Sequence, residues 1–283
     1  SADYIHTVLE ALKLAFADRH VYYGDPDFVN VPLEGILSKE YAAKRRAAID
    51  MNAACPEMPE PGDPWACQPG VNGSSGKMAR PEPLAGRVEA DTCYIAVVDR
   101  WGNAFSATPS DGVGSTPVVE GLGMVISPRG SQSWLDPDHP CSLQPGKRPR
   151  LTPNPALAMK DGKVYMPFGT PGGDVQCQSM VQTFLNVLEF GMDPQQAVEA
   201  PRVSTWSYPG SFVPHAYIPG SVGVEGRIEP LVVKELERRG HQVEVWDDWT
   251  SRMGCMCAIQ VDQKTGALFG GADPRRDGYA MGR

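Results

Sequence analysis

Residues 51–90 limit what the rest of the chain can fold into, because they cannot build a regular core element. They contain seven prolines and five glycines, which interrupt both helices and strands. We therefore predict a mobile loop over about residues 51–91, which divides the chain into residues 1–91 and residues 92–283. β-Forming residues resume directly after the loop, so Thr92 stands at the first position of a predicted strand.

Hydrophobic periodicity and turn residues predict helices and antiparallel hairpins on the two sides of this loop. Helices are expected over residues 2–20, 38–49, 181–188 and 229–239, and from Asp193. Hairpins are expected from strands 93–98 and 104–108, and from strands 156–159 and 164–168. Strands near Glu244, at 258–261 and at 267–270 are expected to complete an antiparallel set. Hairpin-connected strands with grouped helices indicate an α+β fold.

Charge and hydropathy exclude two classes of partner. The formal net charge is −8, and binding to nucleic acid needs a basic face, so we expect no nucleic acid partner. No apolar run reaches the roughly 18 residues that span a bilayer, so no membrane span is expected. The chain begins Ser1-Ala2-Asp3, without a methionine or an apolar leader. This indicates a processed start or a fragment and leaves the compartment open.

The cysteines and histidines give no metal signature. Seven scattered cysteines do not resemble a disulfide framework. Cys255 and Cys257 are one residue apart and His241 stands alone upstream, whereas zinc sites have wider spacing and a second ligand pair. We expect buried thiols, no metal and no organic cofactor. His6 and His20 have no partner that the sequence identifies.

Thr92 is a candidate nucleophile for cutting an amide bond. A threonine hydroxyl attacks an amide only if a base lies beside it, and its own α-amine can be that base once the preceding peptide bond is cut. A threonine that opens a strand after a flexible segment fits this chemistry, although such a threonine is also commonplace in structural roles. Cys93 is an alternative nucleophile. It points to the opposite face of the strand, so Thr92 and Cys93 cannot both serve one site.

Collinear motifs resemble the γ-glutamyltransferase family of the N-terminal-nucleophile (Ntn) hydrolase superfamily. Residues 4–50 resemble the end of that family's large subunit, and residues 91–104, beginning Asp91-Thr92-Cys93, resemble the start of its small subunit. Later motifs are also similar, namely Lys147-Arg148-Pro149, Thr170-Pro171-Gly172-Gly173 and Gly271-Ala272-Asp273-Pro274-Arg275.

The resemblance implies a fold and a reaction. The fold would be a four-layer αββα sandwich of antiparallel sheets, with the N-terminal part of the usual large subunit absent. The chain would cut itself between Asp91 and Thr92 into a large and a small subunit that stay together as a heterodimer, with a dimer of such heterodimers left open. Thr92 would then cleave a small-molecule amide through an acyl-threonine ester.

Further site residues follow from the same resemblance. Backbone N–H groups of Gly172 and Gly173 would form the oxyanion hole. Ser110 takes the place of a second threonine that supports the nucleophile. The family's polar groups for a glutamyl substrate are mostly replaced, at positions held here by Gly112, Arg129, Gln132, Leu151 and Thr152. Glutamyl specificity is therefore doubtful, and Arg129 and Arg150 are candidates to receive an anionic acyl group, or else solvated surface residues.

The sequence leaves the following alternatives open. The chain could be an oxamate amidohydrolase-like or cephalosporin acylase-like hydrolase of the same family. It could also be a truncated, non-catalytic subunit that serves in binding or assembly.

Overall fold

The computed structural model describes residues 1–68, 70, 82–86, 92–111 and 116–282. Two predicted site residues, Asp91 and Gly112, lie outside the described residues. Within residues 51–68 the regular structure is limited to a short 3-10 helix at Trp65–Cys67, as the proline content of the segment predicts.

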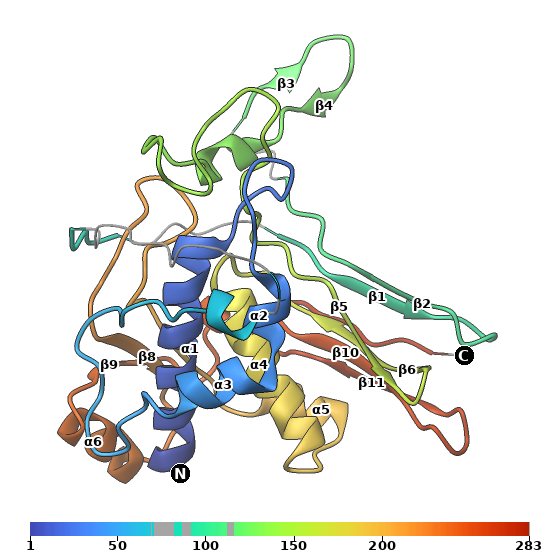
Figure 1. Cartoon of the computed structure of the whole chain (residues 1–283). Coiled ribbons are helices and arrows are strands. Elements are labelled where there is room, and N and C mark those ends of the chain that lie inside the picture. Colours follow the sequence, from blue (N-terminus) through green and yellow to red (C-terminus); the bar gives the residue numbers. More distant parts are fainter. Residues whose placement is uncertain (69, 71–81, 87–91, 112–115, 283) are drawn as a thin grey trace.

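A four-stranded antiparallel sheet forms the right-hand part of the molecule in the view of Figure 1. Its strands follow the order β11, β10, β6 and β5, with bounds Leu268–Ala272, Cys257–Val261, Lys163–Gly169 and Ala156–Lys160. Asp161 and Gly162 have positive φ angles of 48° and 76° in the tight turn between β5 and β6, which is the backbone that a two-residue hairpin needs. Both strands of this predicted hairpin are confirmed.

Helices cover one face of this sheet and a second hairpin covers the other (Figure 1). Helices α4 (Val175–Leu188) and α5 (Pro194–Glu199) pack on the sheet around Met166, Met180 and Met256, which are almost fully buried. The predicted hairpin, β1 (Ile95–Val98) with β2 (Ala104–Ala107), lies over the opposite face. The result is a helix–sheet–sheet stack.

The outer face of the β1–β2 hairpin is apolar and open to solvent. Ile95, Val97 and Phe105 are 51%, 47% and 60% exposed. Tyr94, just before β1, points inward, and a side chain at Gly169 would overlap its ring. The inner face therefore packs against β6, while within the described residues no helix packs over the outer face.

A second, three-stranded sheet lies beside the first. It contains β7 (Val203–Thr205), β8 (Ser221–Glu225) and β9 (Gln242–Trp246). The expectation that the strand near Glu244 joins an antiparallel set is wrong, because β9 pairs with β8 in parallel. Helix α6 (Pro230–Arg238) connects the two strands as a crossover, which parallel pairing requires.

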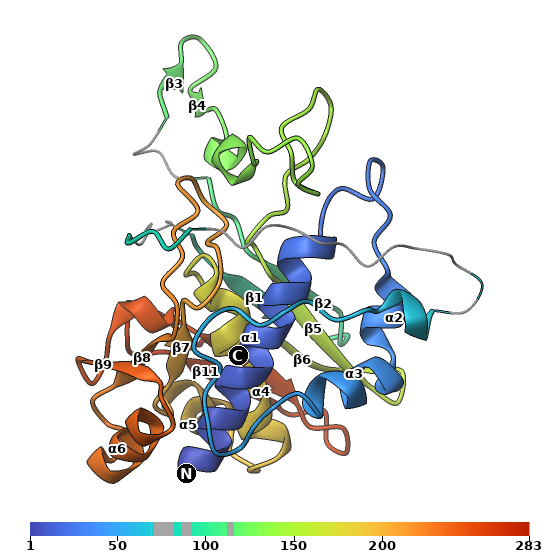
Figure 2. The same cartoon turned by 60° about the vertical axis from the view of Figure 1, so that its left-hand side comes forward.

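Helix α1 (Ala2–Tyr22) joins the two halves of the structure (Figure 2). Its residues Ile5 and Leu9 pack against β7, β8 and α6. Its residues Leu12 and Phe16 belong to a cluster that includes partly buried side chains of α4. Within the described chain, no helix is both long and apolar enough to cross a bilayer.

The remaining elements are short. They are α2 (Leu33–Leu37), α3 (Lys39–Arg46), the 3-10 helices at Pro128–Gln132 and Ser251–Met253, and the small hairpin β3 (Val118–Val119) with β4 (Met124–Val125). Ser38 caps α3, as predicted, by accepting a hydrogen bond of 3.0 Å from the backbone N–H of Tyr41. The α3 helix ends at Arg46, three residues earlier than predicted.

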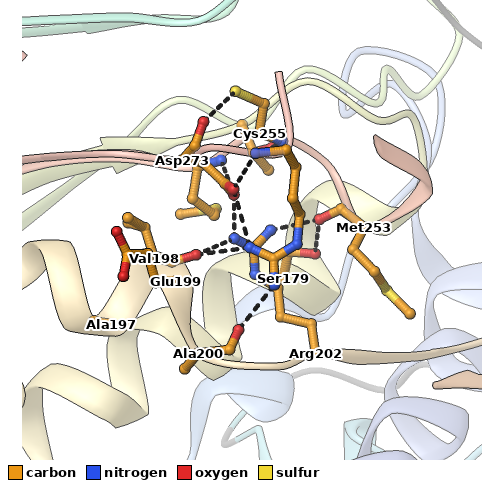
Figure 3. A network of polar contacts seen from close by, with 12 residues as sticks. Ser179, Ala197, Val198, Glu199, Ala200, Arg202, Met253, Cys255 and Asp273 are labelled. Carbon is orange, nitrogen blue, oxygen red and sulfur yellow. Dashed lines mark hydrogen bonds and ion pairs between the residues drawn. The ribbon is translucent and has the colours of Figure 1, made fainter. Parts of the chain in front are cut away.

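A buried network of charges connects the C-terminal motif to both sheets. Asp273 pairs with Arg202 and, at 3.0 Å, with Arg275, while Arg275 also pairs with Glu225 at 2.5 Å. All four side chains are at most 1% exposed. Figure 3 shows Arg202 between Asp273 and the backbone carbonyl groups around it. The Gly271–Arg275 motif therefore has a structural role, because it ties β11 to α5, β7 and β8.

Candidate active site

The hydroxyl of Thr92 is buried and lies against a second hydroxyl. Thr92 lies three residues before the first residue of β1, so the strand begins later than predicted, and Thr92 is 5% exposed. Its Oγ1 atom lies 2.5 Å from Oγ of Ser110. Cys93 is exposed instead, as expected for a neighbouring strand position on the other face. The structure thus brings the predicted nucleophile and its predicted supporting residue together.

Arg129 lies on the far side of Ser110. Its Nη2 donates hydrogen bonds to both the carbonyl oxygen and the hydroxyl of Ser110. Its Nη1 donates to Oγ1 of Thr152 at 3.1 Å and to Oε1 of Gln132 at 3.4 Å. Arg129, Gln132 and Thr152 are 9%, 1% and 3% exposed. Three of the predicted substrate-binding residues therefore form one buried polar group next to Thr92.

The positive charge of Arg129 is only weakly compensated by the described residues. Its bonded partners are neutral oxygen atoms, and the carboxylate of Asp111 lies 3.9 Å away on a side chain that is 53% exposed. Burial lowers the pKa of Arg129 below its usual value, and Asp111 raises it in part. A buried guanidinium favours an anionic partner, so this position can accept a carboxylate.

The backbone of Gly172 and Gly173 fits an oxyanion-binding turn. The φ angles are 130° and 55°, in the region that glycine adopts with least strain. Within the described chain neither N–H donates a hydrogen bond to another residue, and the turn directly precedes α4, whose N-terminal end favours negative charge. Oγ1 of Thr170 fixes the turn by accepting a hydrogen bond of 2.7 Å from the N–H of Cys255.

The packing of Tyr94 on Gly169 places Thr92 and the glycine turn at the same end of the structure. Tyr94 stands two residues after Thr92, and Gly169 stands three residues before Gly172. Because the ring of Tyr94 lies directly on Gly169, the start of β1 and the end of β6 meet. The hydroxyl of Tyr94 is fixed at 2.8 Å from Oγ of Ser106.

A cavity of about 360 Å³ extends from the glycine turn. Gly172 and Gly173 form one edge, and four aromatic side chains contribute to its walls, namely Trp206, Tyr208, Phe212 and Trp246. Asp174 and Ser211 contribute polar atoms, and Arg252 and Arg276 contribute cationic side chains. Sequence reasoning did not find these aromatic residues, because they come from different segments and follow no local pattern.

Arg150 does not join Arg129. It donates hydrogen bonds of 3.3 Å to the carbonyl oxygen of Arg19 and to Oγ of Ser211, and burial lowers its pKa to about 10. Asp174 pairs with Arg19 at 2.5 Å. Burial would raise the pKa of Asp174, but Arg19, Arg150 and Ser211 lower it overall. Arg150 thus belongs to a charge group in the wall of the aromatic cavity.

His6, Glu10 and His241 form a buried group that could in principle hold a metal ion. The nitrogen atoms of the two histidines are 2.9 Å apart, and His6 also contacts the carbonyl oxygen of Asp50 at 2.9 Å. Glu10 pairs with the ammonium group of Lys13 at 2.7 Å. A metal ion would be repelled by Lys13 and would compete with bonds that already exist, so these residues fit a structural role better. The sequence prediction that His241 stands alone is wrong.

His20, the other residue for which the sequence identified no partner, also contacts a histidine. His20 lies 3.5 Å from His139, and Trp134 is stacked between His139 and His215 with ring centroids 4.1 Å and 3.8 Å apart. All seven cysteines lie within the described residues and are free thiols. Cys255 is buried, as predicted, and Cys257 is half-buried.

Antiparallel sheets backed by helices are the architecture of the Ntn-hydrolase fold. The family model described as gamma-glutamyltranspeptidase matches residues 1–283. The chain is 36% identical to the glutathione hydrolase-like YwrD proenzyme of Bacillus subtilis (strain 168), over 100% of this chain and 48% of the relative. It is 32% identical to the oxamate amidohydrolase proenzyme of Klebsiella pneumoniae, over 99% of this chain and 47% of the relative.

A solved structure is also similar. The cephalosporin acylase from Bacillus halodurans matches with a TM-score of 0.79 and 32% identity, over 100% of this chain and 46% of that chain. The chain belongs to the gamma-glutamyltranspeptidase family, and the predicted Ntn-hydrolase fold is confirmed. It spans about half the length of the curated relatives that it matches.

Proposed function

We propose that the protein is a self-processing amide hydrolase or acyltransferase with Thr92 as its nucleophile. The observation that carries this proposal is the buried hydroxyl of Thr92, 2.5 Å from that of Ser110. The relatives support it, because the two described above are named as a glutathione hydrolase-like proenzyme and an oxamate amidohydrolase proenzyme. No metal or organic cofactor is needed for this chemistry.

The proposed reaction has two stages. Cleavage between Asp91 and Thr92 frees the α-amine of Thr92, and the large and small subunits remain together as a heterodimer. The amine then takes the hydroxyl proton while Oγ1 attacks the substrate carbonyl, and the N–H groups of Gly172 and Gly173 stabilise the oxyanion. When the oxyanion collapses, the C–N bond breaks and the α-ammonium of Thr92 gives its proton to the departing amine. Water or an amine acceptor releases the acyl group from the ester on Thr92.

The group around Arg129 favours an anionic acyl chain. A glutamyl substrate carries an α-ammonium, which a guanidinium repels and which Gln132 cannot pair as a carboxylate would. A short diacid or oxamate-like acyl group suits Arg129, Gln132 and Thr152 better. We therefore favour hydrolysis of an amide with an acidic acyl group over transfer of a glutamyl group. We do not expect Arg150 to contact the acyl group.

The test is the intact mass and N-terminal sequence of the purified wild type and of Thr92→Ala. We expect two pieces in the wild type, the smaller one beginning at Thr92, and one uncut chain in the variant. Cys93→Ser is the matched control and should cut normally, which would also dismiss a thiol nucleophile. A single uncut wild-type chain would overturn the proposal in favour of a non-catalytic subunit.

A further inference from the structure

The aromatic cavity borders the glycine turn, whereas the group around Arg129 lies beside Ser110 and Thr92. The cavity is lined by Gly172 and Gly173 but not by Thr92, Ser110 or Arg129. Phe212 lies between the two regions, because it lines the cavity and its ring centroid is 5.4 Å from Cζ of Arg129. A substrate whose carbonyl oxygen lies at the turn, and whose acyl chain points to Arg129, would direct its amine part into the cavity.

The walls of the cavity suit a planar ring. The rings of Trp206 and Trp246 have centroids 5.1 Å apart and are tilted by 53°. Tyr208 is fixed from behind, since it stacks on Phe16 at 3.7 Å and its hydroxyl accepts a hydrogen bond of 2.9 Å from Gln178. Rigid aromatic walls bind flat apolar groups without large losses of side-chain entropy. A volume of about 360 Å³ lies at the small end of ligand pockets and suits one or two rings.

The charge at the cavity favours an anion. Its carboxylate, Asp174, is already paired with Arg19 at 2.5 Å and accepts hydrogen bonds from Ser211. The exposed cations Arg252 and Arg276 contribute to the lining. Arg252 also lies 3.8 Å from the carboxylate of Glu244, but both side chains are about half exposed, so this ion pair is weak and a ligand carboxylate can compete for Arg252. Cζ of Arg252 lies over the ring of Trp246, 5.2 Å from its centroid, so a guanidinium borders the part of the cavity beside Trp246.

We propose that this cavity binds the amine part of the amide substrate as a planar aromatic group that carries a carboxylate. The ring would stack against Trp206, and the carboxylate would pair with Arg252, which lies over Trp246. This assignment rests on the proposed function, because the substrate carbonyl must lie at the Gly172–Gly173 turn for its amine part to enter the cavity.

The test measures binding of the amine itself, so that it does not depend on turnover. Titration calorimetry of the wild type compares 4-aminobenzoate with its uncharged analogue 4-aminobenzamide. We expect 4-aminobenzoate to bind about twofold to fivefold more tightly, as one partly exposed charge contact allows. Arg252→Gln should remove this preference and leave the affinity for 4-aminobenzamide unchanged. Trp206→Leu should weaken both ligands.

Arg100→Gln is the matched control, because Arg100 stands 5.2 Å from the ring of the exposed Trp101 on the β1–β2 turn, an equivalent pair outside the cavity. It should change neither affinity. Equal affinities for the two ligands, or an effect of Arg100→Gln as large as that of Arg252→Gln, would overturn the proposal. If the protein binds 4-aminobenzoate selectively but remains uncut, the proposed ligand of the cavity is supported and the proposed function is refuted. If the protein cuts itself normally but binds neither ligand, the proposed function is supported and the proposed ligand is refuted.

Discussion

Ser110 connects the candidate nucleophile to the buried positive charge. Its hydroxyl lies 2.5 Å from Oγ1 of Thr92 and accepts a hydrogen bond from Arg129. A hydroxyl that accepts from a guanidinium has its own proton directed elsewhere, here towards Thr92. In the proposed reaction Ser110 would therefore orient the hydroxyl of Thr92 for attack, while the charge on the carbonyl oxygen would fall to the Gly172–Gly173 turn.

Replacement of Ser110 tests this role. Ser110→Ala should slow self-cleavage and amide hydrolysis by about tenfold to a hundredfold, because one oriented hydrogen bond to the reacting group is lost. Ser110→Thr keeps the hydroxyl and should remain close to the wild type. The measurement is the rate at which the two fragments form, followed by mass spectrometry. If Ser110→Ala cuts itself as fast as the wild type, the supporting role of Ser110 is refuted.

Sequence alone indicated which residue types form the candidate site but not how all of them are grouped. Thr92, Gly172 and Gly173 lie in motifs, so the sequence marked them. Arg129, Gln132 and Thr152 were predicted near the substrate, and they lie together. Arg150 is two residues before Thr152 but points to another group, because the direction of a side chain in a loop depends on tertiary packing that no local pattern records.

At the scale of elements, the contact between Tyr94 and Gly169 holds β1 on β6. Gly169→Ala should lower the free energy of unfolding by about 1–3 kcal/mol, because the added methyl group overlaps the ring of Tyr94. The lower stability should also slow self-cleavage, since the start of β1 moves with that ring. Thermal unfolding of the uncut Thr92→Ala background measures the first effect.

Gly130→Ala is the control for this change. A Cβ atom at Gly130 meets no described atom within 4 Å, and its φ angle is not in the positive region. Its stability should stay the same or rise slightly. Equal melting temperatures for the two variants would mean that β1 can shift away from β6 at little cost.

Hairpins were predictable and the second sheet was not. Asp161-Gly162 encodes its turn locally, so the pairing of β5 with β6 follows from adjacent residues. The strand near Glu244 was also recognised, but its partner β8 is separated from it by α6, and the parallel direction follows from that crossover. The contact between His6 and His241 joins residues 235 positions apart, a distance over which periodicity carries no information.

At the scale of the whole molecule, buried histidines predict loss of stability in acid. Burial, together with nearby positive charge, lowers the pKa of His20 to about 4, of His139 to about 2 and of His241 to about 3. In the unfolded chain a histidine has a pKa of about 6.5. Between these values the unfolded state binds protons that the native state does not, so stability is full above about pH 6.5 and falls as the pH decreases.

Denaturant unfolding of Thr92→Ala at pH 7.5, 6.0 and 5.0 should show this decline. Each such histidine contributes a slope of at most about 1.4 kcal/mol per pH unit below its unfolded pKa. His241→Gln removes one of these titrating groups and should therefore reduce the slope by up to about 1.4 kcal/mol per pH unit. An unfolding free energy that stays constant from pH 7.5 to 5.0 would contradict the prediction and show that these histidines bind protons in the folded protein.

The charge network of Arg202, Glu225, Asp273 and Arg275 has a consequence for how the molecule opens. Its members come from segments far apart in the chain and are fully buried. If one segment detached, it would leave an unpaired charge in the interior, at a cost of about 3–5 kcal/mol. Partly unfolded states that release β11 or β8 alone are therefore disfavoured. The amide protons of α5, β8 and β11 should then exchange with solvent together, as a single cooperative unit.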